Sequence, residues 1–234
     1  MPLISIVGPA GAGKTTLAAF LAQQPDVRVH TWLPNFRDPK YFLFYTRNTI
    51  EMLPTLAKAY LHKNGYSMAL EDVAWMVGLN GWHRLLRRYK SQPIVMLLEE
   101  GPVVHMAYIR MFGSQLFRNA VLDNWWQRMY RHWANTLDAV IFLDASDLTL
   151  INRVRARNSP HGIKTKPDAE AIQQIRDYRD NYIYLLSMLM AESINLKIIK
   201  INTDQKTPEQ VCAEVQSLLF GTHDIIESTA ETQQ

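Results

Sequence analysis

The residues with the clearest chemical meaning lie close to the start of the chain, between Gly8 and Thr15. This segment reads Gly-Pro-Ala-Gly-Ala-Gly-Lys-Thr and matches the pattern G-x-x-x-x-G-K-[ST]. Glycines let the backbone turn tightly, so that successive N–H groups point into one concavity and bind phosphate oxygens. The pattern therefore predicts a loop for the phosphates of a nucleoside triphosphate, which we expect to be MgATP.

Within this loop, we expect Lys14 to neutralise the β and γ phosphates and the Thr15 hydroxyl to ligate Mg²⁺. Thr16 has a second explanation, since it could instead cap or pack the following helix. A chance glycine-rich turn is the alternative to the whole motif, but an apolar strand before it and an apolar-periodic helix after it favour the phosphate loop. The residues predicted to contact the nucleotide are Gly8, Ala10, Gly11, Ala12, Gly13, Lys14, Thr15 and Thr16.

A pair of acids follows another apolar run, where Ile94-Val95-Met96-Leu97-Leu98 leads into Glu99-Glu100. The carboxyl ends of parallel strands border the ligand crevice, so a carboxylate there can support Mg²⁺ or act as a base toward an acceptor hydroxyl. Side chains alternate along a strand, so we expect only one of the two to reach the site. Asp144, at the end of Val-Ile-Phe-Leu-Asp, competes for the magnesium role. A glutamate pair solvated in a loop is the plain alternative.

Three arginines form the next candidate group. On a helix, Arg153 and Arg157 are four residues apart and share a face, whereas Arg155 points away. Guanidinium groups on a mobile segment can close over a triphosphate and stabilise its charge during transfer, so we assign Arg153 and Arg157 to catalysis. The following Asn-Ser-Pro-His-Gly loop could supply the movement. A solvated basic helix end is the alternative.

Five short apolar runs predict the strands that position these residues, at 3–7, 27–31, 94–98, 139–143 and 196–201. Helical stretches separate them, including one at 69–90 and two within 103–133, so a parallel sheet covered by helices is expected. Most of the six tryptophans are expected to pack in the core. We predict a single domain over residues 1–221 and a flexible tail over 222–234.

Composition narrows the class of protein. The formal net charge is +3, from 25 basic and 22 acidic side chains, which is too small an excess to indicate nucleic acid as a partner. There is no apolar run of membrane-spanning length and no signal-peptide pattern, so a cytoplasmic protein with a small-molecule acceptor is expected. A homodimer is left open. The seven histidines show no metal-ligand spacing, and the single Cys212 is expected to be buried.

The stretch Asp138-Ala139-Val140-Ile141-Phe142-Leu143-Asp144 and the arginine segment 150–158 resemble the thymidylate kinase family, among the P-loop kinases of nucleosides and nucleotides. The resemblance continues around Arg176, Tyr178 and Arg179 and into 199–202 and 208–211. It covers most of the chain in layout, but only the phosphate loop and the arginine segment are specific. It implies a three-layer α/β/α sandwich with a five-stranded parallel sheet of order 2-3-1-4-5, a lid near 153–167, and a last strand whose loop borders the adenine.

The same resemblance bears on the acids. Thymidylate kinases carry Asp-Arg-Tyr after the third strand and deoxynucleoside kinases carry Glu-Arg-Ser, which aligns Glu99 with the functional acid and makes Asp144 structural. Arg37-Asp38-Pro39 is similar to the Arg-Glu-Pro with which thymidylate kinases help to place the acceptor, although a plain turn at Asp-Pro explains it equally well.

Two departures concern the acceptor. Glu100 stands where the family has an arginine that contacts the acceptor or its phosphate, and Ala10 stands where thymidylate kinases have an acid. A carboxylate repels an anionic acceptor, so a neutral or amine-bearing hydroxyl compound is expected in preference to a nucleoside monophosphate.

The overall prediction is an ATP- and Mg²⁺-dependent phosphotransferase. An ATPase or nucleotide-binding regulator without an acceptor is the first rival, although the Asn-Lys-x-Asp motif of GTPases is missing from the sequence. A pseudoenzyme is the second rival, and the intact Lys14 and Thr15 argue against it.

Overall fold

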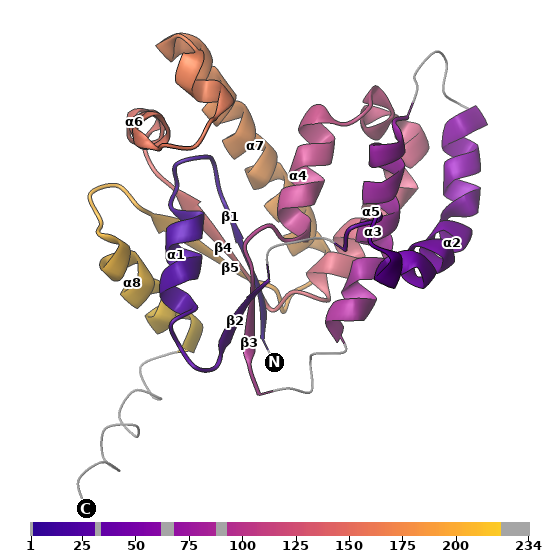
Figure 1. Cartoon of the computed structure of the whole chain (residues 1–234), viewed down its shortest axis with the longest axis horizontal. Coiled ribbons are helices and arrows are strands. Elements are labelled where there is room, and N and C mark those ends of the chain that lie inside the picture. Colours follow the sequence, from indigo (N-terminus) through magenta and orange to yellow (C-terminus); the bar gives the residue numbers. More distant parts are fainter. Residues whose placement is uncertain (1, 31–33, 62–67, 88–92, 221–234) are drawn as a thin grey trace, which may run out of the picture.

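The strands of the computed structural model form one five-stranded parallel sheet, β2-β3-β1-β4-β5 (Figure 1). The structure describes residues 2–30, 34–61, 68–87 and 93–220. Pairing is parallel throughout, with Ile4 opposite Leu97 of β3 and Ile6 opposite Ile141 of β4. The strand bounds are β1 (Leu3–Val7), β2 (Val27–His30), β3 (Val95–Leu98), β4 (Ala139–Asp144) and β5 (Lys197–Asn202).

The predicted sheet is therefore confirmed in strand number, direction and order. β1 and β3 are buried throughout, as expected of strands that are covered on both faces, whereas the edge strands β2 and β5 contain both buried and exposed residues. Strand ends differ from the predicted runs by single residues. Thr31, at the predicted end of the second strand, lies outside the described residues.

Eight α-helices are present in the described part of the chain. They are α1 (Lys14–Leu21), α2 (Phe42–Leu61), α3 (Leu70–Arg87), α4 (Pro102–Phe112), α5 (Asp123–Ala134), α6 (Asp147–Ala156), α7 (Asp168–Glu192) and α8 (Pro208–Phe220). α3 occupies the predicted helix at 69–90, whose last three residues lie outside the described residues. α4 and α5, with two short 3₁₀ turns between them, occupy 103–133.

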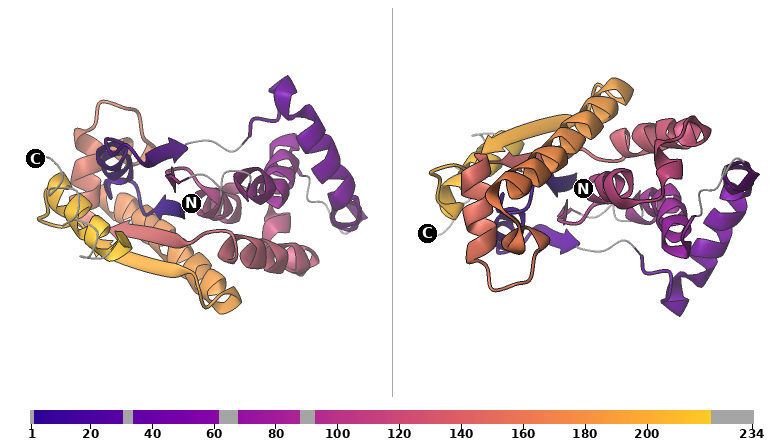
Figure 2. Two further views of the ribbon diagram at one scale, coloured as in Figure 1. Left: turned by 90° about the horizontal axis from the view of Figure 1, so that it is seen from below. Right: turned by 90° about the horizontal axis from the view of Figure 1, so that it is seen from above.

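Two hydrophobic cores lie on the two faces of the sheet. On one face, Ile4, Ile6 and Ile141 pack with apolar residues of α1, α6 and α8. On the other, Leu3, Val140 and Phe142 pack with residues of α3, α4, α5 and α7. This alternation follows from the period of two along each strand. The result is the three-layer α/β/α arrangement visible in Figures 1 and 2.

The tryptophans in the described part of the chain lie in or against one of these cores only. Trp82, Trp125, Trp126 and Trp133 are buried in the core on the α3–α5 side, and Trp75 packs against it. α2 lies outside this layer, where it packs mainly on α3 (Figure 2). Among the described residues there is no helix that is long and apolar enough to span a membrane. The predicted tail at 222–234 lies outside the described residues.

Candidate active site

The phosphate loop connects β1 to α1 at the carboxyl edge of the sheet. Gly8, Gly11 and Gly13 all have positive φ angles, of 145°, 89° and 96°. A Cβ atom on Gly8 would lie 2.1 Å from the carbonyl oxygen of Leu143, and one on Gly11 would lie 2.6 Å from that of Leu150. The loop is thus seated against the end of β4 and against α6, and its first two glycines are required by backbone angle and by space.

Lys14 begins α1 and folds back over the loop. Its Nζ donates to the carbonyl oxygens of Gly8 and Pro9, at 2.7 and 3.0 Å. Burial and then the positive charge of Arg157 lower the pKa of Lys14, Glu99 and Glu100 act in the opposite direction, and the net result is a pKa of about 8. Lys14 is therefore a cation that the free protein stabilises poorly and that phosphate oxygens would stabilise well.

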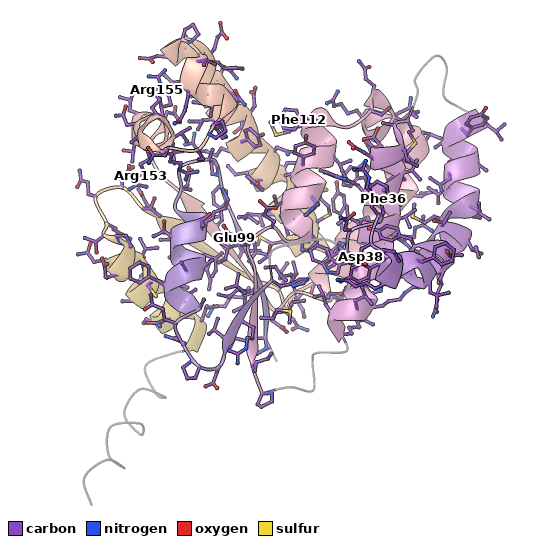
Figure 3. The ribbon with its side chains drawn as sticks, in the orientation of Figure 1. Phe36, Asp38, Glu99, Phe112, Arg153 and Arg155 are labelled. Carbon is purple, nitrogen blue, oxygen red and sulfur yellow. The ribbon has the colours of Figure 1, made fainter. Side chains whose placement is uncertain are left out.

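The two glutamates follow β3 in a turn that leads to α4. Glu99 is half-buried and Glu100 is exposed, and both are close enough to Lys14 to raise its pKa. The prediction that only one of them reaches the site rested on the alternation of side chains along a strand. Because β3 ends at Leu98, that alternation does not apply to the two glutamates. Burial and the neighbouring charge of Glu99 raise the pKa of Glu100. In Figure 3, Glu99 lies between α1 and α4.

Asp144 is held in an ion-pair network instead. Its two carboxylate oxygens accept from Nε and Nη2 of Arg179, at 2.6 and 3.1 Å. Arg179 also donates to Asp147, which in turn accepts from Arg176. This network joins β4, α6 and α7, and both carboxylate oxygens of Asp144 have protein partners. The geometry fits the structural role that the family resemblance implies.

Arg153 and Arg157 line one cavity but differ in how they are held. Nη1 and Nη2 of Arg153 donate to the hydroxyl and carbonyl oxygens of Thr203, at 2.9 and 2.8 Å. The Thr203 hydroxyl donates to the carbonyl oxygen of Asp144. Nη1 of Arg153 also lies 3.5 Å from the carbonyl oxygen of Gly11. Arg153 is thus fixed between the phosphate loop and the segment after β5.

Arg157 is the residue that caps the C-terminal end of α6, and it lines the same cavity as Arg153, as the spacing of four residues predicts. Its φ of −72° is still helical, and only its ψ of 150° turns the following backbone away from the helix. Among the described residues no hydrogen bond or ion pair is found for its guanidinium group. Arg155 points elsewhere and binds Asp168 and the carbonyl oxygen of Lys166. In Figure 3, Arg153 and Arg155 extend in different directions from α6.

The cavity beside the phosphate loop has a volume of about 290 Å³. It lies between α1, the end of α6 and the start of α8 and brings together glycines of the loop with three basic residues. The lining residues are Gly11, Ala12, Gly13, Thr16, Leu17, Arg153, Arg157, Thr203, Lys206, Pro208 and Val211. Thr203 and Lys206 were not predicted individually, since only the loop after the last strand was expected to border the adenine.

A second cavity, of about 680 Å³, lies between β2, β3, α2 and α3. Aromatic rings of Tyr41, Phe44 and Trp82 line it, together with cationic side chains. Trp82 contacts His105 edge-on, and His105 Nδ1 lies 3.0 Å from the carbonyl oxygen of Gly101, directly after the glutamates. The cavity is thus connected through one ring contact and one hydrogen bond to the turn that carries Glu99 and Glu100.

The segment at Arg37-Asp38-Pro39 behaves as a turn. Asp38 caps a short 3₁₀ helix by accepting from the backbone N–H of Lys40, and its carboxylate pairs with the Lys40 ammonium group at 2.8 Å. These contacts explain the aspartate at position 38 as part of a turn. In Figure 3, Asp38 lies on the α3 side of Glu99.

A phosphate loop after β1, an acid after β3, arginines at the end of α6 and the strand order 2-3-1-4-5 together define a P-loop kinase of the nucleoside kinase superfamily. The deoxynucleoside kinase family model matches residues 4–219. The chain therefore belongs to the deoxynucleoside kinase family. It is a kinase, a phosphotransferase of nucleosides or nucleotides, and its family implies a nucleoside triphosphate and a small-molecule nucleoside as the two substrates.

Solved structures with a similar fold include deoxyadenosine kinase from M. mycoides with bound dATP, which is 14% identical with a TM-score of 0.49 over 92% of this chain and 98% of that one. The YorR protein from Bacillus subtilis, in complex with phosphorylated GDP, is 13% identical with a TM-score of 0.52 over 92% and 94%. At this identity the likeness to the YorR protein concerns the fold alone. No curated protein matches the chain.

Proposed function

We propose that the protein transfers the γ-phosphoryl group of MgATP to the hydroxyl group of a neutral nucleoside. The observation that carries this proposal is the position of Glu99 and Glu100, which both act electrostatically on Lys14 from the turn after β3. An acid beside the phosphate-binding lysine suits the deprotonation of a hydroxyl group. A second acid beside it opposes an acceptor that already carries a phosphate.

Magnesium fits the donor set. The Thr15 hydroxyl and the Glu99 carboxylate are hard oxygen donors of the kind that Mg²⁺ selects. They lie at the start of α1 and directly after β3, where Glu99 acts on Lys14. When bound with the nucleotide, the ion neutralises charge on the phosphates.

Residues of the chain itself orient the phosphates, balance their charge and accept the proton. Backbone N–H groups of the loop orient the β and γ phosphates, and Lys14 and Arg157 balance the negative charge that develops on them. Glu99 accepts the proton of the acceptor hydroxyl as the new O–P bond forms and the bond between the γ-phosphorus and the bridging oxygen breaks. The products are the acceptor monophosphate and the nucleoside diphosphate.

We place the acceptor in the cavity between β2, β3, α2 and α3. Its aromatic lining suits a planar base, since offset or edge-on ring contacts favour flat ligands. The resemblance of the lid and of the last strand to thymidylate kinases supports nucleotide binding on the other side of Glu99. We expect the reaction to take place in the cytoplasm.

The test is a steady-state assay of purified protein with MgATP and a panel of deoxynucleosides, ribonucleosides, nucleoside monophosphates and sugars, in which ADP and the phosphorylated product are both measured. We expect ADP formation to depend on a nucleoside. ADP release that no acceptor stimulates would instead indicate an ATPase or regulator. Efficient conversion of a monophosphate, with no competition from any nucleoside, would overturn the assignment of a neutral acceptor.

A further inference from the structure

Four arginines from two helices gather around one imidazole ring, that of His132. Arg84 and Arg87 belong to the last turn of α3, and Arg128 and Arg131 belong to α5. After burial, the charges of all four lower the pKa of His132, so all four lie close to it. This arginine cluster (Arg84, Arg87, Arg128 and Arg131) lies on the face of the sheet opposite to α1, the helix that follows the phosphate loop (Figure 1).

Acidic side chains neutralise only part of the cluster. Arg84 and Arg131 each pair with a glutamate, one on α2 and one on α7. Arg87 and Arg128 have no acidic partner in the part of the chain that the structure describes, and Arg128 donates instead to the hydroxyl oxygen of Thr55, at 2.9 Å. Two positive charges of the cluster are therefore left for an anion that the chain itself does not supply.

Two histidines lie inside this positive region. The rings of His83 and His132 are 4.7 Å apart, and the buried Nδ1 atom of each has no hydrogen-bond partner among the described residues. Burial, the neighbouring His132 and the charges of Arg84 and Arg87 lower the pKa of His83 to about 4. Like charges held together in this way repel one another, and a bound anion would relieve that repulsion.

The cluster opens into a cavity of about 440 Å³ between the second half of α2, the 3₁₀ turn at 120–122 and α5. Arg128, Arg131 and Lys58 line this cavity, together with the side-chain amides of Asn124 and Gln127. Its volume lies in the usual range for small-molecule sites. The lining supplies hydrogen-bond donors and positive charge in one concave surface.

We propose that this cavity and the arginine cluster form a second anion site, which binds the phosphate chain of a small molecule that carries two or three phosphates. Guanidinium groups bind phosphate oxygens through paired, charge-assisted hydrogen bonds. A chain of phosphates, unlike a single carboxylate, has enough oxygens to reach several arginines at once. The concave shape favours a small molecule over a nucleic acid, whose phosphates are bound along an extended basic surface.

The site is also connected to the acceptor side of the protein. Arg84 belongs to the arginine cluster and lines the cavity between β2, β3, α2 and α3, and α2 contributes residues to both cavities. A phosphate chain bound at the cluster would therefore act on the wall of the acceptor cavity. The binding itself does not depend on the proposed reaction.

Imidazole signals in proton NMR test the binding locally. Inorganic triphosphate, titrated into the full chain, should raise the pKa of His132, because a nearby anion favours the charged ring. The signal is assigned with the His132→Gln variant. Since the phosphate loop also binds phosphates, the titration is repeated in Lys14→Ala, where the response of His132 should persist. An unchanged His132 signal at saturating triphosphate, or a response that Lys14→Ala abolishes, would overturn the inference.

Charge-removing variants test which arginines bind the ligand. Arg87→Gln/Arg128→Gln should keep the circular dichroism spectrum, because both side chains are exposed. In the Lys14→Ala background it should weaken triphosphate binding by at least about tenfold in calorimetry, on the scale of losing hydrogen bonds to charged groups. The matched control is Lys197→Gln/Lys200→Gln, which removes the same charge from exposed positions of β5 and should change the affinity less than about twofold.

Two further results would contradict the proposal. An equal loss of affinity in both double variants would show that triphosphate responds only to the net charge of the protein. A DNA duplex that shifts the His132 signal at a lower phosphate concentration than triphosphate does would show that the cluster binds an extended polyanion and not a small molecule.

Discussion

On the α1 side of the sheet's carboxyl edge, the site is built mainly from backbone, because Gly8 and Gly11 pack against the carbonyl oxygens of Leu143 and Leu150. Two hydrogen bonds hold Arg153 to Thr203 on the same side. On the α2 side the wall is made of side chains from well-separated segments, with Phe44 and Trp82 as its rings. The phosphate groups have the same shape in every nucleotide, so a loop of backbone N–H groups can bind them all. Acceptors differ in shape from one enzyme to another, and a wall of side chains can differ accordingly through substitution.

The largest expected effect lies on the backbone-built side. Lys14→Ala should reduce turnover by at least about 10³, on the scale of losing a charged group that stabilises the transferred phosphoryl group. The fold should survive: because the folded pKa of Lys14 lies below its ordinary value, the charged lysine costs stability at neutral pH, and its removal relieves that cost. Calorimetry with ATP, set beside thermal unfolding, checks both statements. Unchanged ATP affinity in a folded variant would contradict the phosphate-loop assignment.

The next effect separates the two candidate acids. Glu99→Gln should slow the chemical step by about 10² or more, the usual scale for general acid–base catalysis. Asp144→Asn should instead lower stability by about 1 to 3 kcal/mol, since it weakens the charged pair with Arg179. Single-turnover kinetics and denaturant unfolding on both variants decide the matter. The reverse ranking would move the acid to Asp144.

The arginines should divide according to how they are held. Arg157→Ala should lower kcat by about 10² with little change in KM for ATP, because a guanidinium group without a protein partner can follow the transferring charge. Arg153→Ala should mainly raise KM, because it frees the Thr203 segment from the phosphate loop. Arg155→Ala, whose side chain binds Asp168, is the control and should change either constant less than about twofold. Equal and small effects for all three would favour a solvated basic helix end.

The pH dependence of ATP binding follows from Lys14. In the free protein its pKa is about 8, and bound triphosphate should raise that value by favouring the charged form. ATP affinity should therefore be constant below pH 8 and fall as pH rises above it, by up to about tenfold per pH unit. Binding near pH 8 should take up a proton, which calorimetry in buffers of different ionisation enthalpy measures. A flat profile between pH 7 and 9.5 would show that Lys14 does not titrate with binding.

The smallest effect concerns Glu100. Glu100→Arg should improve the relative use of a nucleoside monophosphate over its nucleoside by about two- to tenfold, since the change at an exposed position is screened by water and salt. The ratio of kcat/KM for the two acceptors, measured at low and high salt, is the readout, and Glu100→Gln is the neutral control. An unchanged ratio in both variants would place Glu100 away from the acceptor.

The phosphate-binding side and the acceptor side of the site also differ in how much of their structure the sequence predicts. The phosphate loop is a contiguous motif whose glycines are demanded locally, and the strand order follows from the family resemblance. Helical spacing predicts that Arg153 and Arg157 line one cavity, but it does not predict that Arg153 alone binds Thr203. Thr203 and Lys206 belong to no sequence motif. They are recognised as cavity-lining residues only because the segment after β5 packs next to α6 in the tertiary structure. The acceptor wall draws on residues near 30, 41–48, 82–86 and 96, which only the tertiary structure brings together.

The uneven placement of the indole rings has a spectroscopic consequence. All five tryptophans in the described residues lie on α3 and α5, in or against the core on that face of the sheet, while the core around α1, α6 and α8 contains none. Their intrinsic fluorescence would therefore report on one layer of the molecule, while far-ultraviolet circular dichroism reports on the helices of both. If the two signals change at different denaturant concentrations, the layers unfold separately, and if they coincide, the sheet couples them into one cooperative unit.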